Sequence, residues 1–256
     1  VMQDAVAVRR SMAFMQQPDA VAQLQSALQT TTANLRQIVA QNDGVQSTAD
    51  EANDARHFAN TLFNTMRGGF YCDNYQISGP AFAQHIRTFN RALADKHHTF
   101  LTNLPESISH AELDQAVQDR QDHQLHRLFM EYLPLTFSRR HGDPSRPWNL
   151  FDIRVKDEQD RHIISYQGNW RDIFQNWEAL SLSYPDYVNS IIAKFLNATT
   201  ADGYNPYKVT SEGIDWEVIE PENPWSNIGY WGDHQIIYLC RLLELSHKHN
   251  PQALRD

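Results

Sequence analysis

The first half of the chain places apolar residues at the spacing of amphipathic helices. In the clearest case, apolar residues recur three, four and seven positions apart, which puts them on one face of a helix. These positions are Val21, Leu24, Leu28, Leu35 and Ile38. Pro18-Asp19 is a typical start signal before this stripe, and Asn42-Asp43-Gly44 is a typical stop signal after it.

Three more helices are expected before residue 137. They cover residues 48–66, residues 80–101, and a segment that opens at the capping box Ser109-His-Ala-Glu112. The sequence Tyr132-Leu133-Pro134 closes the last of them. We therefore interpret residues 1–136 as a helical N-terminal segment.

The pattern changes at Phe137. Alternating apolar residues in 151–155 and a second short extended run in 162–166, joined by a polar turn, predict a β-hairpin. Helices are expected again at residues 170–182, 185–198 and 234–245. The segment 199–232 between the last two is rich in glycine, proline, asparagine and aromatic residues, and a loop of that length favours a functional role. Residues 137–256 are thus predicted to form a second domain.

Charge and composition exclude several classes of protein. The net charge of −9 without any Lys/Arg run argues against nucleic-acid binding. The sequence contains no apolar run of membrane-spanning length and no secretory leader, and its two cysteines form no ligand-spaced pair. We expect a cytoplasmic protein without membrane contact, without metal and without cofactor. The pairs His97-His98 and His247-Lys-His249 are expected to be surface histidines.

All six tryptophans lie in the second half of the chain. They are Trp148, Trp170, Trp177, Trp216, Trp225 and Trp231. An indole offers a flat apolar face and one N–H donor, which suits the apolar face and polar edge of a sugar ring. The alternative is that these tryptophans pack a core.

Polar residues that could hold a ligand accompany the tryptophans. In a helix that begins at Trp170, the side chains of Arg171, Asp172 and Gln175 lie beside an apolar stripe. The alternative is a structural Asp at the helix start, paired with the Arg. The segment 138–149 contains three arginines, a histidine and an aspartate, and it could bind an anion or a polyol. The alternative is a turn stabilised by Arg–Asp contacts.

Two carboxylates flank Trp216. Asp215 and Glu217 are two residues apart, so they point the same way in an extended segment, and a carboxyl group beside aromatic rings can act as a general acid. The alternative is a pair of exposed loop acids. Asp233 opens the last predicted helix and could be only a cap.

Residues 165–248 resemble the catalytic domain of cellobiose/chitobiose phosphorylase-type enzymes, which are six-hairpin (α/α)6-barrel glycosidases. Three motifs carry the resemblance in the same order. They are Trp170-Arg171-Asp172-Ile-Phe-Gln175, Asp202-Gly203-Tyr204-Asn205-Pro206-Tyr207, and Asn227-Ile228-Gly229 followed by Gly232-Asp233-His234. Asn176 stands where the family pattern has an acidic residue.

The resemblance implies a mainly α fold that is part of an (α/α)6 barrel. It implies that Arg171, Asp172 and Gln175 bind sugar hydroxyls with support from Asp233, while Trp170, Trp216 or Trp231 wall the site. The family's general acid lies on a later hairpin, which would follow Asp256, so a fragment is expected. If the acid lies within this chain, Glu217 is the first candidate and Asp215 the second.

The leading hypothesis is an inverting glycoside hydrolase or phosphorylase that acts on oligosaccharides, with inorganic phosphate as co-substrate in the second case. A non-catalytic carbohydrate-binding protein on a degenerate barrel and a helical protein-interaction module are the alternatives. The sequence leaves the sugar, the linkage and the oligomeric state open.

The sugar site predicts a response in tryptophan fluorescence. We expect saturable quenching by one of glucose, cellobiose, maltose or N-acetylglucosamine, with or without phosphate, and its loss in Asp172→Ala because the carboxylate would bind sugar hydroxyls. If Asp172→Ala kept the wild-type affinity, that role would be excluded. No response from a folded protein would favour a structural or interaction role, or a fragment that lacks part of its site.

Overall fold

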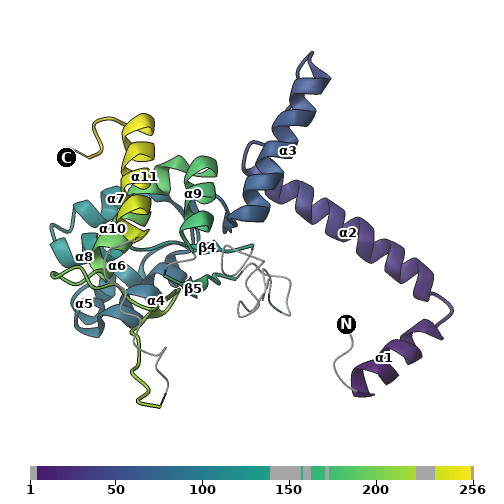
Figure 1. The fold of residues 1–256 in the computed structure, drawn as a ribbon, viewed down its shortest axis with the longest axis horizontal. Helices are drawn as coiled ribbons and strands as arrows, with labels where there is room; N and C mark the ends of the chain where they lie inside the picture. The colour runs from purple at the N-terminus through teal and green to yellow at the C-terminus, as the bar shows by residue number, and fades with distance from the viewer. Residues whose placement is uncertain (1–4, 139–156, 158–162, 171–172, 223–233, 255–256) are drawn as a thin grey trace. The chain divides into compact units, whose positions relative to one another are not determined.

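The computed structural model describes residues 5–138, 157, 163–170, 173–222 and 234–254 (Figure 1). The chain divides into two compact units, residues 1–58 and 59–256. It is mainly helical with small sheets, which confirms the predicted class. The predicted hairpin within 151–166 falls largely outside the described residues, as does the cluster 138–149 except for Ser138.

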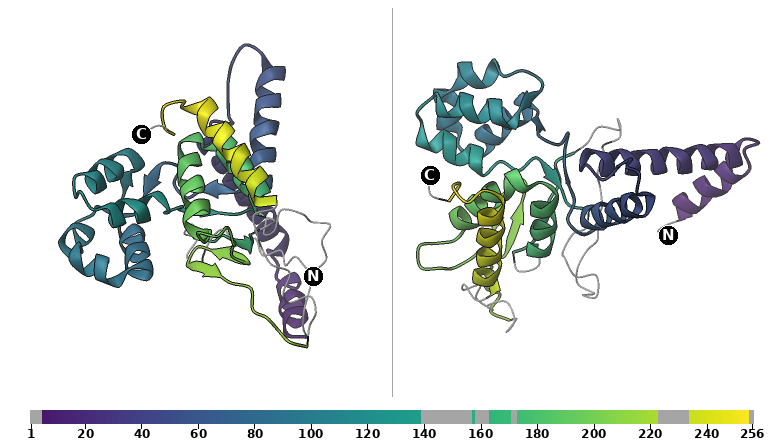
Figure 2. Two further views of the ribbon diagram at one scale, coloured as in Figure 1. Left: turned by 60° about the vertical axis from the view of Figure 1, so that its left-hand side comes forward. Right: turned by 90° about the horizontal axis from the view of Figure 1, so that it is seen from above.

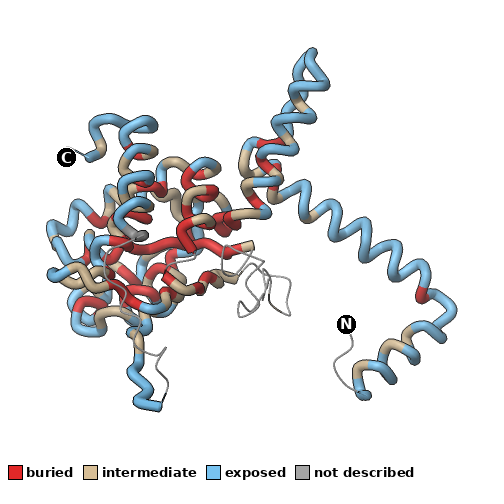
Figure 3. The backbone as a smooth tube through the Cα atoms, viewed as in Figure 1, coloured by how far each residue is buried: buried red, intermediate tan, exposed pale blue. Residues whose placement is uncertain are grey.

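The first unit consists of α1 (Ala5–Met15), α2 (Ala20–Gln41) and the start of α3 (Glu51–Arg67). The α2 helix ends at the predicted stop signal. The amide of Asp43 donates to the carbonyl of Ala40 at 2.9 Å, and the amide of Gly44 donates to the carbonyl of Val39 at 2.9 Å. With Asp43 at φ 57°, this is a Schellman arrangement that satisfies the last helical carbonyls. Most of α1 and α2 is exposed (Figure 3).

The predicted helix at 48–66 corresponds to α3. Gly68 and Gly69 follow its last residue, Arg67. Gly69 has φ 131°, and a Cβ atom there would collide with the carbonyl oxygen of Thr136. A glycine is therefore required for the chain to leave the helix and enter β1 (Phe70–Tyr71), which pairs antiparallel with β4 (Leu135–Thr136).

Residues 76–130 form a small helical cluster joined by a two-stranded sheet. Its elements are β2 (Gln76–Ile77), α4 (Gly79–Phe89), α5 (Arg91–Lys96), α6 (His98–Thr102), β3 (Ile108–Ser109), α7 (His110–Gln118) and α8 (His123–Met130). In Figure 2 these helices gather together, apart from α9 and α11. Their shared core consists of buried residues from every one of these helices, among them Phe82, Ile86, Leu101, Leu113, Leu125 and Phe129.

The continuous helix predicted at 80–101 is wrong, because the chain is extended at Asn90, with φ −153° and ψ 93°. The Asn90 side chain accepts a hydrogen bond from the amide of Leu93 at 3.0 Å and so caps α5. The segment after Ser109 likewise contains two helices instead of one. The predicted capping box is confirmed, since Ser109 and Glu112 make both of its reciprocal hydrogen bonds.

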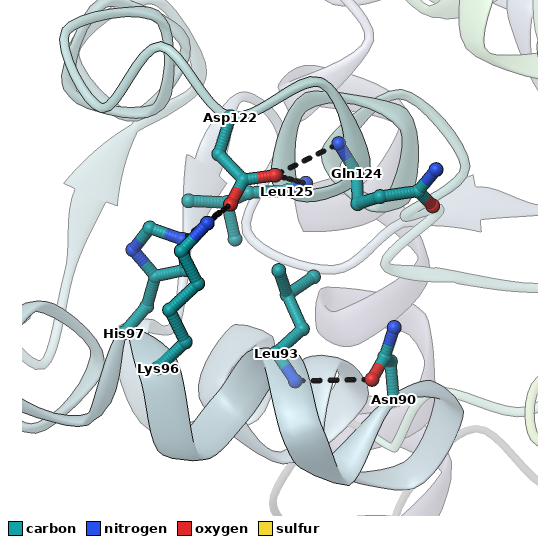
Figure 4. Close-up of polar contacts among 7 residues, drawn as sticks. All are labelled: Asn90, Leu93, Lys96, His97, Asp122, Gln124 and Leu125. Atoms are coloured by element: carbon teal, nitrogen blue, oxygen red, sulfur yellow. Dashed lines mark hydrogen bonds and ion pairs between the residues drawn. The ribbon is translucent and has the colours of Figure 1, made fainter.

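Asp122 lies between those two helices and connects the start of α8 to the end of α5 (Figure 4). One carboxylate oxygen accepts from the amides of Gln124 and Leu125, which caps α8. The other accepts from the Lys96 ammonium at 2.6 Å and contacts Nε2 of His97 at 2.9 Å. These two partners lower the pKa of the Asp122 carboxyl group far below its usual range. The expectation of a surface histidine is wrong for His97, whose side chain is 11% exposed.

The rest of the second unit combines helices with a three-stranded antiparallel sheet. It contains β5 (Gln167–Asn169), α9 (Phe174–Ser183), the 3-10 turn η1 (Pro185–Tyr187), α10 (Val188–Ala198), β6 (Lys208–Thr210), β7 (Gly213–Asp215) and α11 (His234–His249). The sheet order is β5-β6-β7. The long segment predicted as a loop thus contributes the hairpin β6–β7. The helix predicted to begin at Trp170 begins only at Phe174. Trp170 directly follows β5, and its amide donates to the carbonyl of Tyr207 at 2.9 Å.

Aromatic rings connect the two parts of the second unit. Tyr71 of β1 stacks on Tyr187 with ring centroids 3.8 Å apart, and it meets the edge of Tyr184 at 4.9 Å. Tyr187 in turn contacts His110 of the helical cluster at 4.9 Å. None of the described helices combines the length and the apolar character needed to cross a bilayer.

The Asp122 network predicts a pH-dependent contribution to stability. Asn at position 122 would still cap α8, so Asp122→Asn removes mainly the charge. We expect it to lower the free energy of unfolding at pH 7 by about 1 kcal/mol. Because the folded-state pKa is lowered, this stabilisation is present above the unfolded-state pKa of about 3.9 and is lost as the pH falls through the folded-state value.

Urea unfolding between pH 7 and pH 2 measures this difference. Asp119→Asn, which removes an exposed carboxylate near the start of the same connection, is the matched control and should change stability by less than about 0.5 kcal/mol at any pH. A difference between wild type and Asp122→Asn that stayed constant down to pH 2 would show that the carboxylate charge is not the cause.

Candidate functional site

The aromatic stripe predicted at 170–180 is confirmed as an apolar face. Its members, Trp170, Ile173, Phe174, Trp177 and Leu180, are each at most 2% exposed. Trp170 stacks on Phe195 of α10 with ring centroids 5.2 Å apart, and Phe174 stacks on Tyr238 of α11 at 4.7 Å. This face therefore forms the core between α9, α10 and α11.

The polar side of α9 faces neighbouring helices. Glu178 accepts hydrogen bonds from Arg67 of α3 at 3.5 Å and from Arg241 of α11 at 3.1 Å. Asn176 is fully buried and donates to the carbonyl of Gly68 at 3.1 Å. Gln175 is half-buried on the same helix. The side chains of Glu178 and Asn176 therefore make contacts that hold α9 against its neighbours.

A second polar and aromatic group lies on the segment that follows α10. Tyr204 stacks on Trp216 with ring centroids 6.0 Å apart and an interplanar angle of 13°. The Tyr204 hydroxyl donates to the Glu217 carboxylate at 3.0 Å. Trp216 is 42% exposed. We call Tyr204, Trp216 and Glu217 the aromatic platform.

Hydrogen bonds of the loop hold the platform in place. The amide of Tyr204 donates to the hydroxyl of Thr200 at 2.9 Å, and the Thr199 hydroxyl donates to Asn205, which is 1% exposed, at 2.8 Å. On the other side, Trp216 directly follows β7, whose register with β6 is fixed by the sheet. The rings are thereby positioned from both ends before any ligand binds.

The structure brings together only some of the predicted site residues. Trp216 and Glu217 share the platform, whereas Trp170 lies in the core. Asp215 is 61% exposed and pairs with Lys208 across the hairpin at 3.6 Å, so the two carboxylates flanking Trp216 have different partners. Four predicted residues lie outside the described part of the chain, and their roles stay predictions: Arg171, Asp172, Trp231 and Asp233.

Sequence reasoning missed Tyr204 as a site residue. From the sequence, the Asp202-Gly203-Tyr204 motif contributes only to the family resemblance, and no site role is predicted for Tyr204. The exposed indole face of Trp216 and the neighbouring carboxylate have the shape and polarity that suit a sugar ring and its hydroxyl groups. Within the described residues, no three His, Cys, Asp or Glu side chains are grouped as metal ligands would be.

Similarity to known proteins falls elsewhere in the chain. Residues 71–134 match the family described as glycoside hydrolase family 149 insertion domain 1, and this segment corresponds to the helical cluster of α4–α8 with its flanking strands. The match associates the chain with a glycoside hydrolase family and thus with carbohydrate chemistry. It lies within residues 1–136, outside the region that resembles cellobiose/chitobiose phosphorylases. No curated protein matches the chain.

The different burial of the tryptophans predicts different effects on stability. Trp170→Ala removes a fully buried indole and leaves a cavity, so we expect it to lower the free energy of unfolding by about 3–5 kcal/mol. Trp216→Ala should cost less than about 1 kcal/mol, since its ring is partly exposed. Urea unfolding of both variants measures the contrast. Equal losses would mean that Trp216 is a core residue and not a platform.

Proposed function

We propose that this chain is part of an inverting glycoside hydrolase or glycoside phosphorylase that acts on oligosaccharides, with an (α/α)6 barrel of the cellobiose/chitobiose phosphorylase type. Two separate findings support the proposal. The segment 71–134 is similar to an insertion domain of a glycoside hydrolase family. The aromatic platform offers a pre-positioned surface for a sugar ring.

The platform is the single observation that carries the proposal. Large exposed aromatic faces are costly in water, and they are typical of binding sites when polar groups border them. Here the parallel rings of Tyr204 and Trp216 present apolar area, while Glu217 accepts hydrogen bonds at their edge. The C–H face of a pyranose would lie on the indole, and a sugar hydroxyl would donate to the carboxylate.

Within this proposal Glu217 is the first candidate for the general acid and Asp215 the second. Inverting enzymes use two carboxyl groups about 6.5–9.5 Å apart, one to protonate the leaving oxygen and one to activate the attacking water. In a phosphorylase, phosphate takes the place of that water. Arg171, Asp172, Gln175 and Asp233 would bind sugar hydroxyls, as the family resemblance implies.

One observation favours non-catalytic carbohydrate binding as the alternative. Both carboxylates beside Trp216 already have partners, since Asp215 pairs with Lys208 and Glu217 accepts from Tyr204. A carboxylate held by a hydrogen-bond donor is well placed to orient a ligand, whereas a general acid must lie within hydrogen-bond reach of the glycosidic oxygen. Turnover separates the two functions, because both require sugar binding.

The platform predicts that one indole dominates sugar affinity. We expect Trp216→Ala to weaken oligosaccharide binding at least tenfold, or about 1.4 kcal/mol, because the stacking face is lost. Isothermal titration with cellobiose, maltose and N-acetylglucosamine oligomers measures it. Phe63→Ala, which removes an exposed aromatic ring from α3, is the matched control and should bind as wild type does.

Glu217→Gln then distinguishes the alternatives. Retained binding with lost turnover supports the enzyme, whereas binding without turnover in the wild type supports the carbohydrate-binding protein. Unchanged affinity in Trp216→Ala would contradict the platform as the sugar site.

A further inference from the structure

A cavity of about 460 Å³ lies where the helical cluster meets the turn of the β6–β7 hairpin. The volume falls within the range of about 300–1,000 Å³ that is usual for small-molecule sites. Tyr204, Trp216 and Glu217 of the aromatic platform do not line this cavity, so it is a separate feature of the second unit.

Aromatic rings form the apolar part of the cavity wall. His85 and Phe89 of α4 line it together with Tyr132, which follows α8, and Ile164. The ring centroid of His85 lies 4.6 Å from that of Phe89 and 5.0 Å from that of Tyr132. The three rings therefore pack against one another, and core packing sets their positions before any ligand binds.

Polar side chains form the rest of the wall, on two sides. Gln84 and Thr88 come from the exposed side of α4, where Nε2 of Gln84 donates to Oγ1 of Thr88 at 3.3 Å. Ser211 and Glu212 come from the turn of the hairpin. The cavity therefore offers an amide, two hydroxyl groups and a carboxylate, which together can donate and accept hydrogen bonds.

Hydrogen bonds of the backbone hold this turn next to α4. The amide of Ser211 donates to the carbonyl of Tyr166 at 3.0 Å. The amide of Glu212 donates to the hydroxyl oxygen of Thr210 at 3.2 Å, and that hydroxyl donates to the carbonyl of Gly213 at 3.2 Å. Because the turn is already ordered, a ligand would lose little free energy in arranging it.

The charges around the cavity favour a neutral ligand. The wall contains the Glu212 carboxylate and no lysine or arginine among the described residues, which disfavours an anion. The buried ammonium of Lys194 lies outside the wall, 5.2 Å from the ring centroid of Phe89, and disfavours a cation. Burial, and then the charge of Lys194, lower the pKa of His85 to about 3. Its imidazole is therefore neutral near pH 7, and Nε2 can donate to the carbonyl of Leu128 at 3.2 Å.

We propose that this cavity binds one neutral pyranose ring, either a free monosaccharide or the end of a saccharide chain. The C–H face of the sugar lies on the rings of His85, Phe89 and Tyr132, and its hydroxyl groups bind Ser211 and Glu212. An apolar ring face and a border of hydroxyl groups match the two parts of the wall. This site goes beyond the proposed function, because it requires neither the aromatic platform nor turnover.

Titration of the full chain in the Trp216→Ala background tests the site without a contribution from the platform. Isothermal titration with methyl β-glucopyranoside should show saturable binding. Sorbitol offers hydroxyl groups without a ring, and glucuronate adds a negative charge that Glu212 repels, so each should bind at least tenfold more weakly. Cellobiose that binds more tightly than the methyl glucoside would assign the end of a chain, and equal affinity would assign a single sugar.

Ser211→Ala/Glu212→Ala removes a hydroxyl and an exposed carboxylate from the wall. In the same background we expect it to weaken binding of the methyl glucoside at least tenfold. Thr102→Ala/Glu106→Ala is the matched control, because it removes an exposed hydroxyl and an exposed carboxylate that do not line the cavity, and it should leave the affinity unchanged.

NMR of the otherwise unchanged protein provides a second measurement, which does not depend on how Trp216→Ala folds. The ring protons of His85 should shift on addition of methyl β-glucopyranoside, and this shift should be lost in Ser211→Ala/Glu212→Ala. Unaltered affinity and an unaltered His85 shift in that variant overturn the proposal. So does tighter binding of sorbitol or glucuronate, or no saturable binding to folded protein. Failure of the platform in Trp216→Ala does not change these outcomes, so the two proposals fail separately.

Discussion

The second half of the chain depends on the burial of one aromatic face, which is formed by α9 and the residues just before it. Trp170, Phe174 and Trp177 are nearly inaccessible to water, and burying a large apolar side chain contributes roughly 1.5–3 kcal/mol relative to leaving it exposed. Phe195 and Tyr238 meet this face from α10 and α11. The position of α9 in turn fixes Glu178 between Arg67 and Arg241. It also places Asn176 against Gly68, and a larger residue at position 68 would collide with the backbone carbonyl oxygen of Asn176.

This core positions the aromatic platform without being part of it. Helix α10 contributes Phe195 to the core and leads into the loop that carries Tyr204 of the platform. The same helix holds Lys194 near the ring of Phe89 and Asn197 against Glu131. A change in how α9 and α10 pack would therefore alter both the platform and the contacts of α10 with the helical cluster.

The helical cluster owes its shape to polar residues that end helices. Asn90 and Asp122 each interrupt what would otherwise be longer amphipathic segments, and both accept hydrogen bonds from the first amides of the next helix. These interruptions let short helices turn back and bury Phe82, Leu113 and Leu125 together. Tyr187, packed between Tyr71 and His110, connects this cluster to the α9–α11 part and so links the segment with glycoside hydrolase similarity to the rest of the unit.

The sequence by itself determined the helical class, the start and end of α2, the capping box at Ser109, and the apolar face of α9, because each depends on residues that are close together in the chain. It did not reveal the breaks at Asn90 and Asp122, since a cap residue within an apolar pattern is recognised only when its side chain meets the next helix. It also gave equal weight to Trp170 and Trp216. Only the tertiary structure decided that the first is core and the second exposed, and that Lys194 is buried beside the rings of Phe89 and Tyr166. Burial and pairing depend on contacts between residues far apart in the sequence.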